Sequence, residues 1–424
     1  MVGEKSLKLA VPYKKVGNGR LAWAQMVAEF CGHPEKKMKF IGVTGTDGKT
    51  TTVNILAAML KKAGIRTSMS STVGAVIGKS KVSSKVLQTG SPSPDVLFPL
   101  LLEMKKKGME MVVLETTSHG LNQDRFGDII FEVGVITNLA SDHMEYHGNI
   151  KEYRRVKARV IDKSKKVVLN ELGGEYEYFK RKASKKAVSF NRKKGVRNVS
   201  YVFGGNGIKQ RAEIKYGSKW VRIETLLLGD YNLENILAVG KVAELFGIKQ
   251  ADFVEAINNF VGVEGRLVRV ANNKGVNAMV DFAHTEQGLK GILSLVNTKL
   301  KKKDEKIIVV FGCNGDRDRT KRAPMGKVAA KLSDVVIITN EDPRNEDPGQ
   351  IFEDIEKGLK KGGMKFGKSY FREDDREKAI EKAVRMAKKG DWVLCLGKGH
   401  EKTINIGSKF LDWDEREVLR KALL

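Results

Sequence analysis

The chain has 424 residues, of which 41% are hydrophobic and 30% charged, and its formal net charge is +26. This composition is typical of soluble globular proteins, and the length predicts two or three domains. No apolar run approaches the roughly 20 residues that span a bilayer, and the N-terminus lacks the apolar stretch of a signal peptide. We therefore expect a cytoplasmic protein with no membrane partner. The three cysteines form no CxxC pair, which excludes a disulfide framework and a zinc ribbon.

The positive charge fits a polyanionic partner such as nucleic acid, or phosphorylated substrates, or simply a lysine-rich surface set by the composition of the host's proteins. The basic residues form short runs along the whole chain, such as 105–107 and 299–303, and aromatic residues are not interleaved with them. This pattern argues against nucleic acid as the main partner. We expect a monomer that acts on small-molecule substrates.

Apolar runs alternate with helical patterns, which predicts an α/β fold with mostly parallel sheets. In the first half, the pattern predicts a strand at 38–43 that is followed by a helix at 51–63. Short alternating segments between 199 and 228 predict an antiparallel patch. The other predicted strands are 109–114, 133–137, 278–282, 306–311, 334–339 and 392–396. The other predicted helices are 232–246, 251–260 and 376–388.

Gly-Val-Glu-Gly at 262–265 interrupts this pattern and marks a domain boundary. We expect a central domain at 39–263 and a Rossmann-like α/β domain at 264–424. Residues 1–38 are too few for a domain and are expected to form a lead-in segment.

The segment 42–52, GVTGTDGKTTT, joins the first predicted strand to its helix and has the composition of a phosphate-binding loop. Glycines let backbone N–H groups surround phosphate oxygens, and the helix N-terminus adds partial positive charge. Lys49 can neutralise phosphates and the Thr50 hydroxyl can bind Mg²⁺, although Val43 occupies the first glycine position of the strict motif. The candidate ATP-binding residues here are Gly45, Thr46, Asp47, Gly48, Lys49, Thr50 and Thr51.

Two polar segments follow predicted strands. Glu115 ends an apolar run, and a carboxylate at the end of a strand near a phosphate loop suits a hard cation. The segment 137–148 contains His143 and His147 among Asp, Asn and Ser residues. A single histidine is more often structural than a ligand, but several histidines at strand ends favour a functional site.

These segments together resemble the Mur ligase family. The loop 45–50 is similar to the GT(N)GKT loop of Mur ligases and folylpolyglutamate synthases, with Asp47 in place of the commoner Asn. Segments 115–121, 137–148 and 153–157 are closest to the motifs E(V/T)SSHGL, TNLxxDHxDYHG and YxxxK of the UDP-MurNAc-tripeptide synthetases. The resemblance implies a P-loop-type ATPase domain followed by a Rossmann-like domain that binds an amino acid.

The resemblance extends from about Leu21 to the C-terminus. These synthetases carry an N-terminal domain that binds the uridine diphosphate, and only the end of that domain is matched, at 18–34. We therefore expect the acceptor to be held more weakly, to be held by basic surface residues, or to lack the nucleotide.

The family resemblance implies ATP and Mg²⁺ as cofactors. One ion would be held by Thr50 and Glu115, and His143 would help to hold a second. Lys157 would be carbamylated to N6-carboxylysine, because a carbamate converts a cationic lysine into an anionic oxygen ligand. Together with Lys49, these residues form the expected catalytic group.

Further residues match family positions that bind substrates. On the acceptor side these are Thr89, Ser118 and Arg125. On the nucleotide side they are Asn232, Asn235, Arg266, Asp281 and His284. Asn232 and Asn235 share one helical face and could read an adenine edge, although Asn232 could instead be a helix N-cap.

The motifs GCNGDRD, EDPR and GKGHE in the last domain resemble the family's amino-acid site. By resemblance, Arg317 and Arg344 bind the carboxylate of the incoming amino acid, and Glu401 binds its distal ammonium. Gly397 is a further candidate substrate-binding residue. Arg344 favours meso-diaminopimelate, whereas Asp342, which replaces an Asn of the family motif, suits an amine and leaves L-lysine open.

The expected function is that of an ATP-dependent acid–amino-acid ligase of peptidoglycan precursor synthesis that forms ADP and phosphate. It would add a diamino acid to UDP-MurNAc-L-Ala-D-Glu, or a close relative, through an acyl-phosphate. One alternative is a folylpolyglutamate synthase-like ligase. The other is a non-catalytic nucleotide-binding protein with a basic surface that binds nucleic acid.

Overall fold

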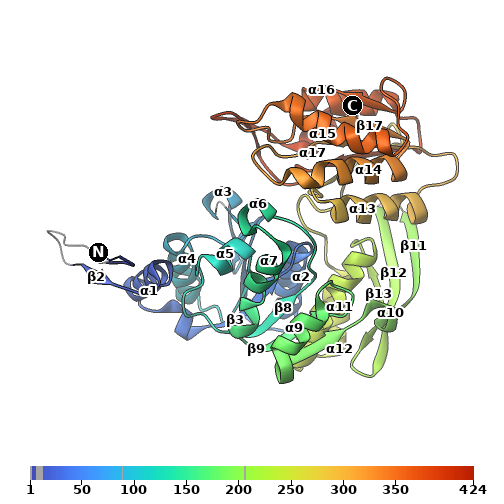
Figure 1. The fold of residues 1–424 in the computed structure, drawn as a ribbon. Helices are drawn as coiled ribbons and strands as arrows, with labels where there is room; N and C mark the ends of the chain where they lie inside the picture. The colour runs from blue at the N-terminus through green and yellow to red at the C-terminus, as the bar shows by residue number, and fades with distance from the viewer. Residues whose placement is uncertain (1, 6–12, 88, 205–206) are drawn as a thin grey trace.

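The computed structural model describes residues 2–5, 13–87, 89–204 and 207–424. Two large sheets are each covered by helices, and a three-stranded sheet lies between them in the sequence (Figure 1). The predicted α/β class is confirmed. Part of the lead-in segment, residues 6–12, lies outside the described residues. Within the described ranges, no helix is long and apolar enough to cross a membrane.

The first sheet has eight strands in the order β10-β9-β8-β3-β7-β4-β5-β6. The strands from β10 to β4 run parallel, and β5 and β6 extend one edge in antiparallel orientation. Because β3 is central, the loop after it opens at the middle of the sheet edge, where open α/β sheets bind ligands. The strands are β3 (Lys39–Thr44), β4 (Thr67–Ser71), β5 (Gly74–Ile77), β6 (Ser80–Val82), β7 (Met111–Glu115), β8 (Phe131–Ile136), β9 (Ser164–Asn170) and β10 (Ala187–Phe190).

Helices cover both faces of this sheet. They are α1 (Gly19–Phe30), α2 (Lys49–Lys62), α3 (Ser84–Leu87), α4 (Pro94–Lys106), α5 (Ser118–Asn122), α6 (Met144–His147), α7 (Ile150–Lys157), α8 (Arg159–Asp162), α9 (Tyr176–Ala183), α10 (Arg192–Gly195), α11 (Asp230–Leu245) and α12 (Gln250–Asn258). Short elements are β1 (Val2–Gly3), β2 (Lys14–Lys15), η1 (Pro34–Lys37) and η2 (Ser184–Lys186).

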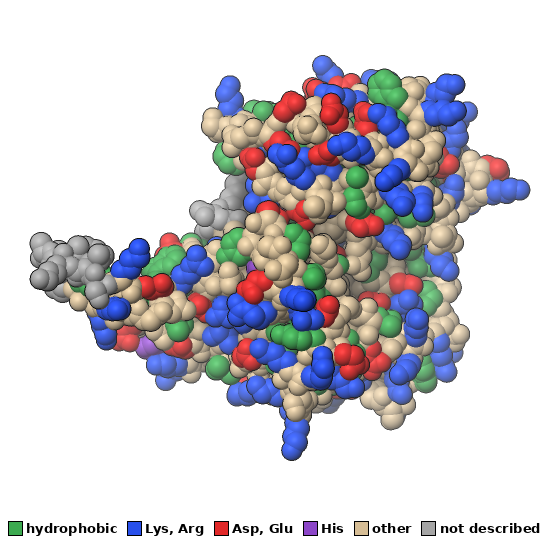
Figure 2. Space-filling view, in the orientation of Figure 1, with side chains coloured by type: hydrophobic (Ala, Val, Ile, Leu, Met, Phe, Trp, Pro, Cys, Tyr) green, Lys and Arg blue, Asp and Glu red, His purple; other side chains and the backbone are tan. Residues whose placement is uncertain are grey.

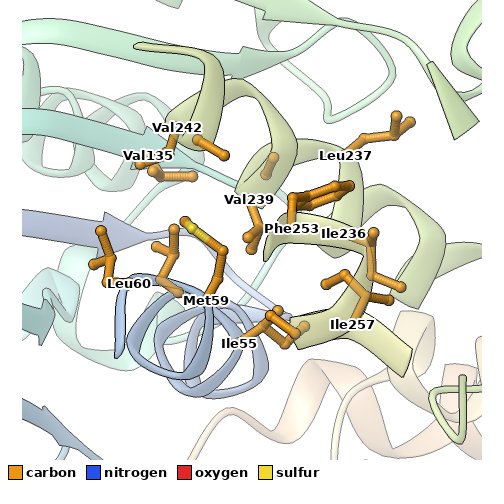
Figure 3. Packing of buried hydrophobic residues seen from close by; sticks show 14 of the residues in the cluster. Ile55, Met59, Leu60, Val135, Ile236, Leu237, Val239, Val242, Phe253 and Ile257 are labelled. Atoms are coloured by element: carbon orange, nitrogen blue, oxygen red, sulfur yellow. The ribbon is translucent and has the colours of Figure 1, made fainter. Parts of the chain in front are cut away.

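Helix α2, which follows the phosphate loop, is held by an apolar core. Figure 3 shows Ile55 and Met59 of α2 lying beside Val239 of α11 and Ile257 of α12. All four side chains are fully buried, and such close packing tolerates little movement. The helix begins two residues earlier than predicted, at Lys49. The packing of α2 therefore fixes the position of the phosphate loop that precedes it.

The predicted antiparallel patch is confirmed as a sheet of β11 (Val196–Gly204), β12 (Gly207–Tyr216) and β13 (Lys219–Thr225). Its residue Ile208 and the following Leu228 are buried in the apolar core of the second sheet's layer, which also contains Leu289 and Ile292 of α13. In Figure 1, α13 lies across the ends of β11 and β12. This contact joins the two halves of the molecule.

The second sheet has six strands in the order β14-β15-β19-β16-β17-β18. All pairs are parallel except β14 with β15, and this antiparallel strand was not predicted. The strands are β14 (Val268–Val270), β15 (Asn277–Asp281), β16 (Ile307–Phe311), β17 (Val335–Ile338), β18 (Tyr370–Arg372) and β19 (Trp392–Leu396), and a hairpin of β20 (Thr403–Ile406) and β21 (Lys409–Asp412) follows. The helices are α13 (Glu286–Leu295), η3 (Val296–Leu300), η4 (Arg319–Lys321), α14 (Arg322–Leu332), α15 (Pro348–Lys361), α16 (Arg376–Met386) and α17 (Glu415–Ala422).

Candidate active site

A cavity of about 1020 Å³ lies between the two sheets' layers. Its walls include the phosphate loop, the start of α11, Arg266 and the segment 281–288. The strand ends of both large sheets therefore contribute to one cleft.

The phosphate loop is held from outside by Asn138. The Asn138 Oδ1 atom accepts hydrogen bonds from the backbone N–H groups of Thr46 and Asp47, at 3.1 and 2.9 Å. Gly48 ends the loop with φ +80, and a Cβ there would lie 2.5 Å from Asn235 Oδ1, so only glycine fits. Lys49 Nζ donates to Thr46 O at 2.8 Å. These contacts within the protein hold the backbone of the loop in place.

Thr50 and Glu115 lie together, as predicted for a cation site. The Thr50 hydroxyl donates to Glu115 Oε2 at 2.9 Å, and Thr72 donates to both carboxylate oxygens through its N–H and hydroxyl. Hard oxygen ligands of this kind fit Mg²⁺. No group of three or more His, Cys, Asp or Glu side chains in the described ranges could hold a metal ion alone, so further ligands would have to come from phosphate or water.

Lys157, at the end of α7, is buried beside the same loop. Its Nζ donates to Gly45 O at 2.6 Å, and its side chain is only 1% exposed. Burial, reinforced by the nearby charge of Lys49, lowers the Lys157 pKa well below its usual value. A neutral amine is the form that reacts with carbon dioxide, so this environment fits a carbamate.

His143 lies at the rim of the cleft rather than against Glu115. Its ring nitrogens are 3.4 Å from Asp142 Oδ2 and 3.6 Å from Glu145 Oε1. Burial would raise the pKa of Asp142, but the nearby histidines His143 and His284 and the lysines Lys321 and Lys49 lower it to about 2. Within the described residues, no hydrogen bond or ion pair joins His143 to Thr50 or Glu115.

Of the three predicted acceptor residues, Thr89 lies in the loop between α3 and α4, Ser118 begins α5, and Arg125 lies just after α5. Arg125 Nη1 donates to Thr89 Oγ1 at 3.2 Å and to Ser91 O at 2.5 Å, so Thr89 and Arg125 are in contact. Ser118 Oγ lies 3.0 Å from His147 Nε2. Burial and the nearby His143 and Lys157 lower the pKa of His147 to about 4, so the ring is neutral near pH 7.

The predicted nucleotide residues converge on the cleft from both sides. Arg266 Nη2 lies 3.4 Å from Thr50 Oγ1, and Arg266, Asp281 and His284 all line the cavity. Burial raises the pKa of Asp281 to about 6 and, with Lys321 nearby, lowers that of His284 to about 3.

Asn232 and Asn235 also line the cavity, but their amides make structural hydrogen bonds. Asn232 Nδ2 donates to Leu228 O at 2.8 Å, and Asn235 Nδ2 donates to Asn232 Oδ1 at 3.2 Å. The Thr52 hydroxyl donates to Asn235 Oδ1 at 3.2 Å, which ties α11 to α2. The alternative of an Asn232 N-cap is wrong, because the N-cap of α11 is Gly229.

In the last domain, Arg317 lies near Arg344. Burial and the nearby charge of Arg344 both lower the pKa of Arg317. Neither guanidinium forms an ion pair with a residue in the described ranges. By contrast, the buried Lys398 Nζ donates to Asp342 Oδ1 at 2.9 Å and to Glu401 Oε2 at 2.6 Å. Asp342 Oδ1 also accepts from the N–H of Asn405 at 2.9 Å. The site therefore holds two unpaired cations beside an internally paired acidic group.

Sequence reasoning missed several residues of the cleft. Asn138 lies in the polar segment 137–148, which could have identified it. Thr72 follows β4, and no motif in the sequence marks it as a site residue. Only the fold brings it to Glu115. Gly397 was predicted to bind substrate, and a Cβ there would lie 2.4 Å from Glu341 Oε2, so the backbone approaches this buried acid closely.

Two protein-family models match this chain. The model of the Mur ligase middle domain matches residues 43–243, and that of the Mur ligase glutamate ligase domain matches 265–399. The chain belongs to the Mur ligase family. Members of this family are ATP-dependent ligases that use Mg²⁺.

Two curated Mur ligases align with almost the whole chain. The UDP-N-acetylmuramoyl-L-alanyl-D-glutamate–2,6-diaminopimelate ligase of Geobacillus thermodenitrificans is 35% identical over 438 residues, which cover 100% of this chain and 86% of the relative. The UDP-N-acetylmuramyl-tripeptide synthetase of a Roseiflexus species is 33% identical, covering 98% of this chain and 84% of the relative.

Solved structures show the same Mur ligase fold. A UDP-N-acetylmuramoyl-L-alanyl-D-glutamate–2,6-diaminopimelate ligase superposes with a TM-score of 0.65 at 27% identity, covering 100% of this chain and 86% of that chain. A Mycobacterium tuberculosis folylpolyglutamate synthase superposes with a TM-score of 0.69 at 17% identity. The superposition covers 89% of this chain and 92% of that chain. At that identity the likeness concerns the fold alone.

Proposed function

We propose that this Mur ligase joins meso-diaminopimelate to the D-glutamate of UDP-MurNAc-L-Ala-D-Glu, forming an amide, ADP and phosphate. The observation that carries this choice is that Arg317 and Arg344 lie near each other, and neither forms an ion pair within the described residues. Meso-diaminopimelate has a carboxylate at each end, whereas L-lysine has only one. Two guanidinium groups without internal partners suit a ligand with two carboxylates.

In the sequence, Asp342 is the reason to keep L-lysine as an alternative substrate. In the structure, Asp342 is already hydrogen-bonded within the protein. Asp342 already accepts hydrogen bonds from Lys398 and from the Asn405 backbone. The buried ammonium of Lys398 offsets the charge of Asp342. Asp342 would therefore bind a substrate amine more weakly than an unpaired carboxylate would. Glu401 is paired with the same Lys398 ammonium, at 2.6 Å, but within the described residues it accepts no second hydrogen bond like that from Asn405. Its side chain is 34% exposed, against 12% for Asp342. Glu401 is therefore the more accessible of the two carboxylates for the distal ammonium.

In the proposed reaction, an oxygen of the acceptor carboxylate attacks the γ-phosphorus of ATP, and ADP leaves. The amine nitrogen then attacks the acyl carbon, and phosphate leaves as the amide forms. Lys49 and Arg266 would bind the phosphate oxygens, and Lys49 would exchange its bond to Thr46 O for one to phosphate. The two layers that line the cleft would exclude water that could hydrolyse the acyl-phosphate.

Mg²⁺ would be held by Thr50 and Glu115, and by Lys157 as N6-carboxylysine, with His143 helping to hold a second ion. When bound, it would neutralise charge on the phosphate oxygens. Because residues of one chain line both sides of the cleft, we also propose that the enzyme acts as a cytoplasmic monomer on small molecules. Figure 2 shows Lys and Arg scattered over this face among acidic residues, which does not favour a nucleic-acid surface.

The test is phosphate release from Mg-ATP with UDP-MurNAc-L-Ala-D-Glu, with meso-diaminopimelate and L-lysine supplied separately and products identified by mass. We expect a tripeptide with meso-diaminopimelate and none, or far less, with L-lysine. A product with L-lysine alone would contradict the role given to Arg344. No product with either amino acid would contradict the proposed acceptor.

A further inference from the structure

Two loops of the last domain carry the arginines of the proposed amino-acid site. Residues 312–318 follow β16 and contain Arg317, and residues 339–347 follow β17 and contain Arg344. Because β16 and β17 are parallel neighbours, both loops leave the same edge of the sheet. Burial and the charge of Arg344 lower the pKa of Arg317, and the two like charges repel each other. Contacts within the protein must therefore hold the two loops together.

The backbones of the two loops are hydrogen-bonded to each other. The Gly315 N–H donates to Asp342 O at 2.8 Å, and the Asn345 N–H donates to Asp316 Oδ2 at 3.2 Å. A Cβ at Gly315 would lie 1.9 Å from Pro343 O, so this close approach requires glycine. The loops therefore meet backbone to backbone.

The carboxylate of Glu346 joins the same loops through a buried arginine. Its Oε2 atom accepts a hydrogen bond from the Asp316 N–H at 3.0 Å. Arg322 Nη1 and Nη2 donate to its Oε1 and Oε2 atoms, both at 2.7 Å, and Nη2 also donates to Asn314 O at 3.2 Å. The side chains of Glu346 and Arg322, which we call the clamp, are 5% and 0% exposed, so solvent screens their pairing little. The exposed Arg319 adds a longer contact to Glu346 at 3.2 Å, which solvent weakens.

The clamp holds backbone of unusual conformation beside both arginines. Asp316, which precedes Arg317, has φ +53, and Arg344 has φ +54. Residues other than glycine rarely adopt this left-handed conformation, and it persists where the surroundings hold it. Glu346 bonds the Asp316 N–H and lies two residues after Arg344, whose own N–H donates to Asn405 O of β20 at 3.1 Å. One carboxylate thus fixes the backbone next to both guanidinium groups.

We propose that Glu346 is a positioning residue that sets the spacing between Arg317 and Arg344 and so favours an amino acid with two carboxylates. The proposal rests on the proposed function, because it concerns how that function's two arginines are held. Both oxygens of Glu346 are bonded within the protein, so it acts through the arginines. A fixed spacing favours a ligand whose carboxylates match it, since the two groups are ordered before binding. L-Lysine has one carboxylate and gains less from that order.

The test compares Glu346→Gln with Asp354→Asn by calorimetric binding of meso-diaminopimelate in the presence of ADP and Mg²⁺, with L-lysine measured by competition. Each substitution removes one negative charge that pairs with Arg322 and keeps the size of the side chain. Asp354 lies on α15, and within the described residues it has no hydrogen bond to either loop. In Glu346→Gln, we expect the Kd of meso-diaminopimelate to rise about 10-fold and that of L-lysine to change less than about 2-fold. Asp354→Asn should leave both Kd values unchanged.

Arg322→Lys tests the other half of the clamp, because lysine keeps the charge but cannot form two parallel bonds to a carboxylate. The same selective loss of meso-diaminopimelate binding is expected, and melting temperatures establish that each variant is folded during the assay. An unchanged Kd for meso-diaminopimelate in Glu346→Gln, an equal loss for both amino acids, or the same loss in Asp354→Asn would overturn the clamp.

Wild-type turnover, measured in the same preparation, separates this result from the proposed function. A selective loss of binding in Glu346→Gln without wild-type turnover would support the clamp and contradict the reaction. Wild-type turnover with an unchanged Kd in Glu346→Gln would overturn the clamp alone. No binding of meso-diaminopimelate by wild type would overturn both.

Discussion

The two sides of the cleft differ in how their charged groups are satisfied. On the phosphate side, Glu115, Lys49 and Lys157 all have internal hydrogen-bond partners, and Asn138 fixes the loop. On the amino-acid side, Arg317 and Arg344 have no carboxylate partner in the described residues. The comparison teaches that the protein's own contacts hold the proposed phosphate side, whereas the proposed amino-acid side leaves two guanidinium groups for a ligand to satisfy. Substitutions on the two sides should therefore alter different kinetic constants.

The largest expected effect is on the phosphate side. Glu115→Ala should reduce kcat on the order of 1,000-fold, because it removes the buried carboxylate beside Thr50. Steady-state phosphate release would measure the effect, and circular dichroism would check the fold. Glu110→Ala, which removes an exposed carboxylate just before the same strand, serves as the control. Near-wild-type turnover of Glu115→Ala would contradict its role as a metal ligand.

A smaller effect is expected from Arg344→Ala on the amino-acid side. The KM for meso-diaminopimelate should rise about 10- to 100-fold, because a charge-assisted contact to a carboxylate is lost. The KM for ATP should stay unchanged. Arg319→Ala is the matched control, since Arg319 is 64% exposed and pairs with Glu346. An equal rise of both KM values would show that the two sides are not separable.

The smallest effect is expected from Asn138→Ala, which sharpens the comparison within the phosphate side. Loss of the side-chain acceptor for Thr46 and Asp47 should loosen the loop and raise the KM for ATP about 5-fold. The KM for the amino acid should not change. A rise in the KM for the amino acid with no rise in the KM for ATP would contradict the role of Asn138 in holding the phosphate loop.

Much of the fold was predictable because its signals are local. The apolar run of β3, the glycines of the loop and the helical pattern of α2 are contiguous, and the structure confirms all three elements within about two residues. The three-residue strand β14 was not predictable, because its pairing with β15 is decided by tertiary contact. The same holds for β5 and β6 at the edge of the first sheet.

The site was predictable only where residue type and motif agree. Thr50 and Glu115 are brought together as expected, but the sequence could not show that Thr72 donates to the same carboxylate. The pairing of Asp342 with Lys398 depends on two loops from different strands, so the sequence alone suggested a free acid. Whether His143 and the carbamate of Lys157 hold metal ions stays a prediction.

Ile208 and Leu228 share an apolar core with α13, and this shared core limits how such a protein can be recombined. These two side chains belong to the sequence before the proposed boundary at 263–264, yet they are buried in the core that follows it. A chimera that joins this central domain to the last domain of a relative must therefore supply a matching apolar surface on its first helix. Without that match, two apolar side chains would be exposed at the junction, and each would lose about 1.5–3 kcal/mol of burial free energy. The two domains are consequently expected to be inherited as a pair.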